Sequence, residues 1–258
     1  MSRYFKSVAL SDVGLHRNEN EDAGWAGHTV LAVADGLGGH VGGEIASSLA
    51  IHEISRLEKI SLNTRNFETT ATNTFIEINN LMAQQMKANR DLRGMGTTLT
   101  AVFISKESVY LAHLGDSRAY LIRNGKITQL SKDHTVIQEL LDQGRINPDE
   151  VDGHPQRSLI TKALMGSDQH ERPDIVELDF NDDDFLLLCS DGLTGVVDES
   201  KILKVINEKG VSEEALTQLK NLTFKKGAPD NVTIILASIT TKKTATPGFI
   251  GIAKGGQK

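Results

Sequence analysis

The residues best suited to chemistry are carboxylates that recur where apolar, strand-like runs begin or end. Four positions share this pattern: Asp35-Gly36, Asp116, Asp191-Gly192 and Asp230-Asn231. Carboxylates at strand ends can converge on one rim of a sheet, and a neighbouring glycine lets a backbone carbonyl approach a metal. Oxygen ligands suit hard ions such as Mg²⁺ or Mn²⁺ rather than zinc. One such aspartate is most simply part of a turn, but four of them together with Glu21-Asp22 indicate a divalent-metal site.

A glycine-dense loop over residues 36–43 invites a nucleotide-binding interpretation, which its spacing disfavours. The dinucleotide pattern that starts at Gly36 requires Gly or Ala at position 41, where the chain has Val41. The Gly-Lys-Ser/Thr of a phosphate-binding P-loop is absent from this loop. The loop is therefore better interpreted together with Asp35, the candidate metal ligand directly before Gly36.

Taken together and in order, these motifs resemble the metal-dependent protein serine/threonine phosphatases of the PPM (type 2C) family, in its compact bacterial form. The resemblance covers about residues 5–239. It is carried by Ser11-Asp12-Val13-Gly14, Arg17, Asn20-Glu21-Asp22, Ala34-Asp35-Gly36-Leu37-Gly38-Gly39-His40, Gly94-Met95-Gly96-Thr97-Thr98, Gly115-Asp116-Ser117-Arg118, Ser190-Asp191-Gly192-Leu193 and Asp230-Asn231-Val232-Thr233. Each motif is weak alone, and the set is specific.

The resemblance implies two Mn²⁺ or Mg²⁺ ions per active site, with a third, weaker ion as an option. The implied metal residues are Asp35 as the bridging ligand, the Gly36 carbonyl, Asp191 and Asp230 for the second ion, Asp116 for the third, and Glu21 and Asp22 acting largely through metal-bound waters. Arg17 would bind the substrate phosphate. A metal-bridging hydroxide would attack phosphorus in line, without a covalent enzyme intermediate.

The identity of the general acid is the weakest part of this assignment. Some members of the family carry a histidine directly after Asp-Gly, where this chain has Leu37. His40 lies three residues further on and is our candidate, alongside Arg17 and Asp35, for the catalytic set. A polar role at the entry of the following helix explains His40 equally well.

The implied activity is hydrolysis of phosphoserine and phosphothreonine in proteins, including a cognate kinase or its substrates. Two alternatives remain open: a non-catalytic regulatory relative and a phosphatase for small metabolites with the same fold. The presence of every expected carboxylate favours an enzyme over the non-catalytic relative. We expect a monomer.

Composition restricts the location and the partners of the protein. The chain has 258 residues and a formal net charge of −6, which argues against nucleic acid as the main partner. Its single cysteine, Cys189, excludes an internal disulfide. No apolar run approaches the roughly 18 residues of a membrane helix, and residues 1–12 lack the features of a signal peptide. We therefore expect a cytoplasmic protein.

The pattern of apolar residues predicts an α+β fold with antiparallel sheets. Strands are expected over residues 28–34, 97–104, 108–114, 118–122, 126–130, 175–180, 185–189 and 231–239. Helices are expected over residues 45–57, 67–86, 136–143, 203–209 and 213–225. Asn124-Gly125 is a strong hairpin signal. The family resemblance makes this a central sandwich of two sheets flanked on both sides by paired helices.

We expect one phosphatase domain over residues 1–239, with a flap over about 144–174, and a flexible basic tail over residues 240–258. Residues 149–184 contain eleven acidic residues against three basic ones. We assign this acidity to the flap, and hypothesise that it favours phosphosites flanked by Lys or Arg.

Overall fold

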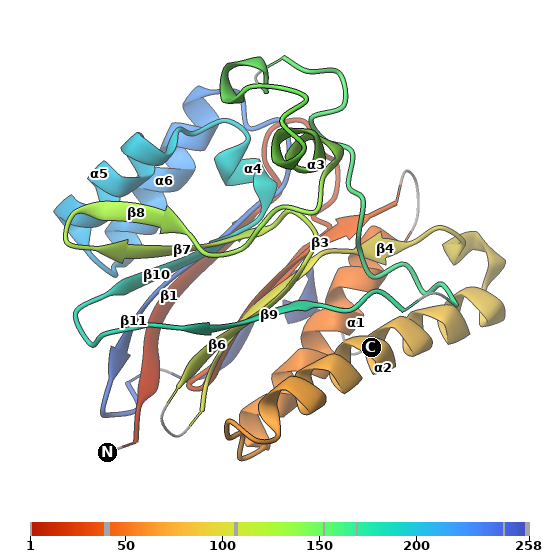
Figure 1. Ribbon diagram of the computed structural model, residues 1–258, viewed down its shortest axis with the longest axis horizontal. Coiled ribbons are helices and arrows are strands. Elements are labelled where there is room, and N and C mark those ends of the chain that lie inside the picture. Colours follow the sequence, from red (N-terminus) through yellow and green to blue (C-terminus); the bar gives the residue numbers. More distant parts are fainter. Residues whose placement is uncertain are drawn as a thin grey trace.

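Two antiparallel sheets stacked face to face form the centre of the molecule, with a layer of helices on each outer face (Figure 1). The computed structural model describes residues 2–38, 42–105, 108–151, 153–168, 170–244 and 246–255. This architecture confirms the predicted α+β sandwich.

The first sheet has five strands in the order β1-β11-β10-β7-β8. Their bounds are β1 Tyr4–Asp12, β7 Arg118–Arg123, β8 Lys126–Gln129, β10 Phe185–Cys189 and β11 Val232–Thr240. Asn124 and Gly125 form the predicted tight turn between β7 and β8, with φ values of 51° and 70°. Positive φ at both positions is the requirement that made this pair a hairpin signal.

The second sheet has seven strands in the order β12-β2-β3-β5-β6-β9, with β4 pairing to β3 beside this path. Their bounds are β2 Asp22–Ala26, β3 Val30–Leu37, β4 Gly96–Thr97, β5 Leu99–Ile104, β6 Val109–Leu114, β9 Asp174–Leu178 and β12 Gly248–Gly251.

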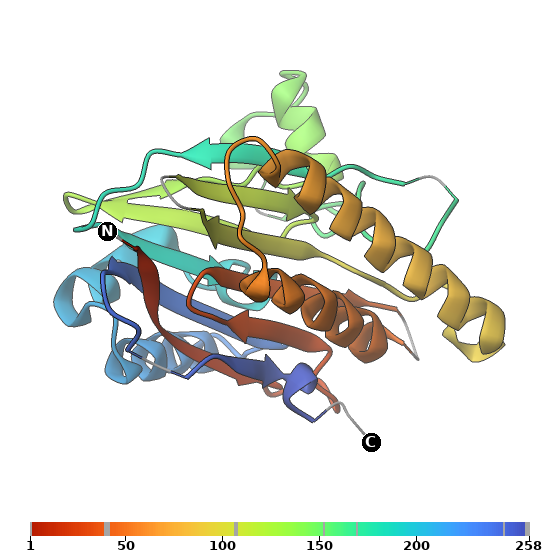
Figure 2. The same cartoon turned by 90° about the horizontal axis from the view of Figure 1, so that it is seen from below.

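Helices α1 and α2 cover the seven-stranded sheet, and α5 and α6 cover the five-stranded sheet (Figures 1 and 2). The helices are α1 Gly43–Ser55, α2 Phe67–Ala88, α3 Val136–Asp142, α4 Asp191–Thr194, α5 Glu199–Lys209 and α6 Glu213–Lys225, with short 3-10 turns η1 Arg56–Lys59, η2 Arg90–Leu92, η3 Pro148–Glu150 and η4 Ile252–Lys254. Ser212 caps the N-terminus of α6, because its hydroxyl accepts a hydrogen bond from the Ala215 N–H at 3.2 Å.

The four layers enclose three apolar cores, which explains why the central strands read as continuous apolar runs. Along β10, Leu186 and Leu188 point into the core between the sheets, whereas Leu187 and Cys189 point toward α5 and α6. Both faces of such a strand are buried, so the usual alternation with polar residues disappears.

Two N-terminal strands were absent from the sequence prediction. Strand β1 lies at the edge of its sheet, and most of its residues are only partly buried. Strand β2 is five residues long and includes Gly24. A short or half-exposed strand carries a weak apolar pattern, so neither was visible in the sequence.

The prediction of a flexible tail over residues 240–258 is wrong for residues 248–254, which form β12 and η4. Strand β12 pairs antiparallel with β2, and Phe249 stacks against Trp25 with ring centroids 4.7 Å apart. Figure 2 shows this blue strand beside the red N-terminal strands. The edge of β2 was open to pairing, and the apolar residues of β12 supply the burial that holds the strand there.

The acidic segment 149–184 does not form one surface beside the predicted site. Arg123 pairs with Asp179 at 2.9 Å and with Asp184 at 2.7 Å. The register of β7 against β10 places these pairs at the end of the sheet opposite Asp191. Assigning the whole acidity to the flap was therefore wrong, because part of it neutralises arginines at the distal end of the sandwich.

Candidate active site

The predicted carboxylates meet at one rim of the sandwich, although they come from five separate places in the chain. Asp22 begins β2 and lies opposite Asp35 of β3 in the strand register. Asp116 lies in the turn between β6 and β7, Asp191 begins α4 directly after β10, and Asp230 precedes β11. Asp35 is not after its strand, as the sequence suggested, but inside it.

Asp35 is held by the two threonines of the Gly94–Thr98 motif. Its backbone N–H donates to the Thr98 hydroxyl at 2.9 Å, and its carbonyl accepts from the Thr97 hydroxyl at 2.9 Å. The side chain of Asp35 lies within hydrogen-bond reach of Asp191. The backbone is thus fixed on both sides while the carboxyl group faces a second carboxyl group.

Asp22 is fully buried and is held by a network of hydroxyl groups. The Ser190 hydroxyl donates to Asp22 Oδ2 at 2.7 Å and accepts from the Thr233 N–H at 3.0 Å. Thr233 in turn donates from its own hydroxyl to Ser11 at 2.7 Å. The other carboxylate oxygen, Asp22 Oδ1, is buried without a hydrogen-bond partner in the described part of the protein.

Asn231 ties the segment that carries Arg17, Glu21 and Asp22 to the start of β11. Its side-chain oxygen accepts from the Glu21 N–H at 2.8 Å, and its amide nitrogen donates to the carbonyls of Val13 and Glu19 at 2.9 and 3.0 Å. Arg17 donates to Asp230 Oδ2 at 2.8 Å and is half-exposed. The predicted phosphate-binding arginine therefore lies on the carboxylate rim.

Burial and mutual repulsion raise the pKa values of Asp22, Asp35, Asp116 and Asp191. Burial, with repulsion from Asp191 and Asp230, raises the pKa of Asp22 to about 7, although the Ser190 hydroxyl favours its charged form. Burial and repulsion from Asp191 raise the pKa of Asp116 to about 7. Burial and the surrounding aspartates raise the pKa of Asp35 well above its ordinary value. These carboxylates destabilise one another unless positive charge compensates them.

Glycines permit the backbone to come close around this rim. A Cβ on Gly192 would lie 1.9 Å from the Asn231 carbonyl oxygen. A Cβ on Gly36 would lie 2.3 Å from the Gly43 carbonyl oxygen and 2.8 Å from that of Glu21. Any side chain at either position would force the strands and loops of the rim apart.

A cavity of about 340 Å³ opens beside these carboxylates. Its wall includes Asp116, Asp191, Asp230, Arg118, Asp133 and, from the segment after α3, Arg157. Figure 1 places α3 and the green segment after it at this end of the sheets, beside α4. The cavity therefore lies between the carboxylate rim and the predicted flap.

The chemistry of the rim fits hard divalent cations. The unpartnered buried oxygen of Asp22, the raised pKa values and the all-oxygen donor set are the properties expected of such a site. Among the described residues, no three His, Cys, Asp or Glu side chains are grouped so that they could hold a metal by themselves. Mg²⁺ and similar ions keep several waters, so one or two carboxylates per ion suffice.

The structure brings together Asp22, Asp35, Asp116, Asp191 and Asp230, with Glu21 and Arg17 at the rim. His40 lies outside the described residues, as do its neighbours 39 and 41. Sequence reasoning missed Ser190, Asn231 and Thr98 as residues that hold the carboxylates. Each stands next to an acidic residue or a glycine motif already quoted, and that adjacency was the available signal.

The family model described as Protein phosphatase 2C matches residues 19–223 of the chain. The chain is 43% identical over 238 residues to the serine/threonine protein phosphatase PstP of Mycobacterium tuberculosis, covering 90% of this chain and 44% of that protein. It therefore spans less than half the length of that relative. It is 34% identical to the serine/threonine phosphatase stp of Listeria monocytogenes, covering 88% of this chain and 92% of that protein.

Solved structures of bacterial serine/threonine phosphatases are also similar to this chain. The crystal structure of the M. tuberculosis serine/threonine phosphatase PstP/Ppp is similar with a TM-score of 0.86 at 40% identity, covering 91% of this chain and 98% of that one. The catalytic domain of PstP in complex with two manganese ions is similar with a TM-score of 0.84 at 37% identity, covering 93% of this chain and 100% of that one.

Within the described residues, none of the helices combines the length and the apolar character that crossing a bilayer requires.

Proposed function

The chain belongs to the protein phosphatase 2C family, and on that premise we propose that it is a Mn²⁺- or Mg²⁺-dependent protein serine/threonine phosphatase. The observation that carries the proposal is the convergence of five aspartates at one rim. Four of them, Asp22, Asp35, Asp116 and Asp191, have raised pKa values, and Asp230 lies beside them. Five aspartates at one rim are costly in stability without a compensating cation. The two manganese ions in the related PstP domain support the same conclusion.

The residues that would hold two cations are Asp35, the Gly36 carbonyl, Asp191 and Asp230, with Glu21 and Asp22 contributing through water. Asp116, beside Asp191 in the cavity wall, would serve a third and weaker ion. Divalent ions at such a site supply activation of a water molecule and neutralisation of phosphate charge.

The chain's own side chains would bind and orient the phosphate. Arg17 lies on the rim at 2.8 Å from Asp230, where a half-exposed guanidinium can donate to phosphate oxygens arriving from solvent. Thr97 and Thr98 keep the backbone of Asp35 fixed, and Ser190 keeps Asp22 in one orientation. A rigid carboxylate set places the reacting groups without reorganisation during the reaction. His40 remains a proposal for the general acid.

We further propose phosphorylated serine and threonine proteins as the substrates, among them a cognate kinase or its targets, and a cytoplasmic monomer as the acting form. The segment of residues 144–174 is proposed as a flap over the cavity, since Arg157 from this segment lines the cavity wall. Because β12 pairs with β2, we also propose that the catalytic domain extends beyond residue 239 to include β12.

The test is metal-dependent hydrolysis by the purified chain, first of p-nitrophenyl phosphate and then of a panel of phosphopeptides and phosphorylated metabolites. Activity should vanish with EDTA and return with Mn²⁺. Asp191→Ala should lower kcat by about a thousandfold or more, since it removes a residue that faces both Asp35 and the cavity. A matched control is Asp198→Asn, because Asp198 is exposed and pairs only with Lys201 in the described structure.

Near-normal turnover by Asp191→Ala would refute the proposed role of this residue. Hydrolysis that persists in EDTA would refute metal dependence. Hydrolysis of metabolites without hydrolysis of phosphopeptides would instead favour the small-metabolite alternative.

A further inference from the structure

An arginine lies in the wall of the acidic cavity. Arg118 stands two residues after Asp116 on β7, and it lines the same cavity as Asp116 and Asp191. Burial raises the pKa of both aspartates, and the positive charge of Arg118 opposes that shift. A long, flexible cation in this position could pair with the carboxylates that we propose as metal ligands.

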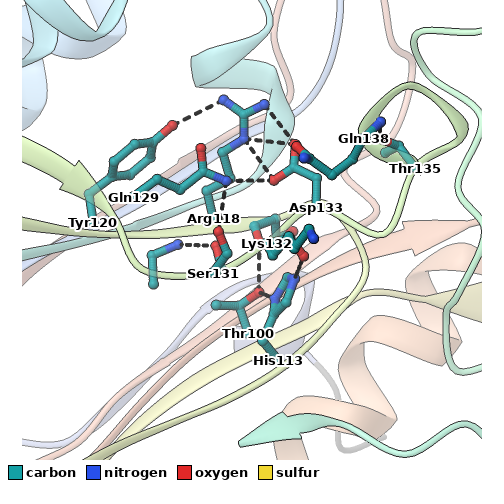
Figure 3. Close-up of polar contacts among 12 residues, drawn as sticks. Thr100, His113, Arg118, Tyr120, Gln129, Ser131, Lys132, Asp133, Thr135 and Gln138 are labelled. Carbon is teal, nitrogen blue, oxygen red and sulfur yellow. Dashed lines mark hydrogen bonds and ion pairs between the residues drawn. The ribbon is translucent and has the colours of Figure 1, made fainter. Parts of the chain in front are cut away.

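The structure instead directs the guanidinium of Arg118 toward a different carboxylate, Asp133. Arg118 Nε donates to both oxygens of Asp133 at 3.0 Å, and Nη2 donates to Oδ2 at 2.7 Å. The remaining nitrogen, Nη1, donates to the Tyr120 hydroxyl at 3.0 Å. Figure 3 shows the three side chains in this arrangement. Every nitrogen of the guanidinium thus has a partner outside the carboxylate rim.

Asp133 is itself held in place for this contact. It lies in the connection between β8 and α3, and its Oδ1 also accepts from the Gln129 amide at 2.8 Å (Figure 3). The side chains of Asp133 and Arg118 are 10% and 29% exposed. A planar, two-point contact of this kind fixes the direction of an arginine better than a single point charge does.

We propose that Asp133 is a positioning residue that holds Arg118 away from Asp116 and Asp191 and neutralises its charge, so that those carboxylates stay open to a divalent cation. The inference rests on the proposed metal site. Without the carboxylate of Asp133, the guanidinium would carry an uncompensated charge in the cavity wall, and its nearest acceptors would include the proposed ligands. Arg118 would then compete with the cation.

The same strand provides a matched control pair. Arg123, five residues after Arg118 on β7, donates Nε and Nη2 to the two oxygens of Asp184 at 2.9 and 2.7 Å. These side chains are 28% and 3% exposed, and the pair lies at the opposite end of the sheet from Asp191. Asp184→Asn therefore breaks an equivalent Arg–Asp pair without placing a free arginine near the rim.

The experiment is calorimetric titration of the metal-free full chain with Mn²⁺, which measures binding independently of turnover. Asp133→Asn should weaken Mn²⁺ binding about tenfold or more, and Asp133→Glu, which keeps the charge, should restore it to within about threefold. The double variant Arg118→Gln/Asp133→Asn should also return to within about threefold of the unsubstituted protein, because the competing cation is gone. Asp184→Asn should lower the melting temperature and leave the Mn²⁺ affinity unchanged.

Two results would overturn the inference while leaving the proposed function intact. One is unchanged Mn²⁺ affinity in Asp133→Asn. The other is a double variant as weak as Asp133→Asn, since the loss would then come from disturbed packing rather than from Arg118. Circular dichroism on each variant confirms that the compared proteins are folded. Absence of Mn²⁺ binding by the unsubstituted chain would overturn the proposed function and this inference with it.

Discussion

The burial of Asp22 makes the stability of the metal-free protein depend on pH in an unusual direction. Burial raises the pKa of this carboxyl group from 3.8 to about 7, so the folded state holds a proton that the unfolded chain has already released. The free energy of unfolding therefore falls as pH rises between those two values. Most proteins with salt-bridged carboxylates lose stability in the opposite direction, toward acid.

The size of the effect follows from the shift. Each pKa unit corresponds to about 1.4 kcal/mol, so a group shifted from 3.8 to about 7 costs the folded state about 3 kcal/mol between pH 5 and pH 8. For a chain of this size, that corresponds to a fall of roughly 6–12 °C in Tm. Asp35, Asp116 and Asp191 shift in the same direction, and the cluster titrates as a unit.

The assay is thermal unfolding in EDTA at pH 5 and pH 8, followed by circular dichroism, for the unsubstituted chain and for Asp22→Asn. The variant removes one buried charge, so its metal-free form should melt higher than the parent at pH 8 and show a smaller dependence on pH. Stabilisation by Mn²⁺ should be reduced in the same variant.

Asp184→Asn is the control with the opposite sign. Although burial opposes ionisation, hydrogen bonds from Arg123 and the Asn181 N–H lower the pKa of Asp184, so its charge stabilises the fold above its ordinary pKa. This variant should melt lower than the parent at pH 8. The reasoning about Asp22 is refuted if the metal-free parent melts at the same or a higher temperature at pH 8 than at pH 5, or if Asp22→Asn loses stability equally at both.

Two further predictions concern Ser190, which holds the site, and the C-terminal strand β12. Ser190→Ala removes the hydroxyl between Asp22 and a buried N–H, and should cost about 2–4 kcal/mol and weaken Mn²⁺ binding in calorimetry. Ser131→Ala also removes a buried acceptor of an N–H but touches no carboxylate of the rim, and should cost stability alone; equal Mn²⁺ binding by both variants would contradict the role of Ser190. Ending the chain after Thr240 removes β12 and the packing of Phe249, so Tm should fall by several degrees in a thermal melt, whereas a dispensable tail would leave Tm unchanged.

Much of the fold was predictable because its signals are local. The apolar stripe of α2, the Asn124-Gly125 turn and the Ser212 cap depend on residues close together in the chain. Strands β1 and β12 were missed because their pairing depends on partners far along the chain. Strand β2 pairs with the nearby β3, and it was missed because five residues that include Gly24 carry a weak apolar pattern. Strand β1, for example, pairs with β11 more than 200 residues away, and most of its residues are only partly buried.

For the candidate site, the sequence by itself determined which side chains are available. The aspartates, the adjacent glycines and their order along the chain identified an oxygen-ligand site and the family. These features are properties of residue type and spacing, and both can be read without coordinates.

Only the tertiary structure decided how those side chains are held. The register of β2 against β3 sets Asp22 opposite Asp35. Ser190, directly after β10, orients Asp22, and Asp133 directs Arg118 away from the rim. The structure also shows that part of the acidic segment, including Asp179 and Asp184, lies at the end of the sandwich opposite Asp191. The physical reason is that burial, hydrogen-bond partners and pKa shifts depend on which distant segments meet, and strand pairing over long separations settles that.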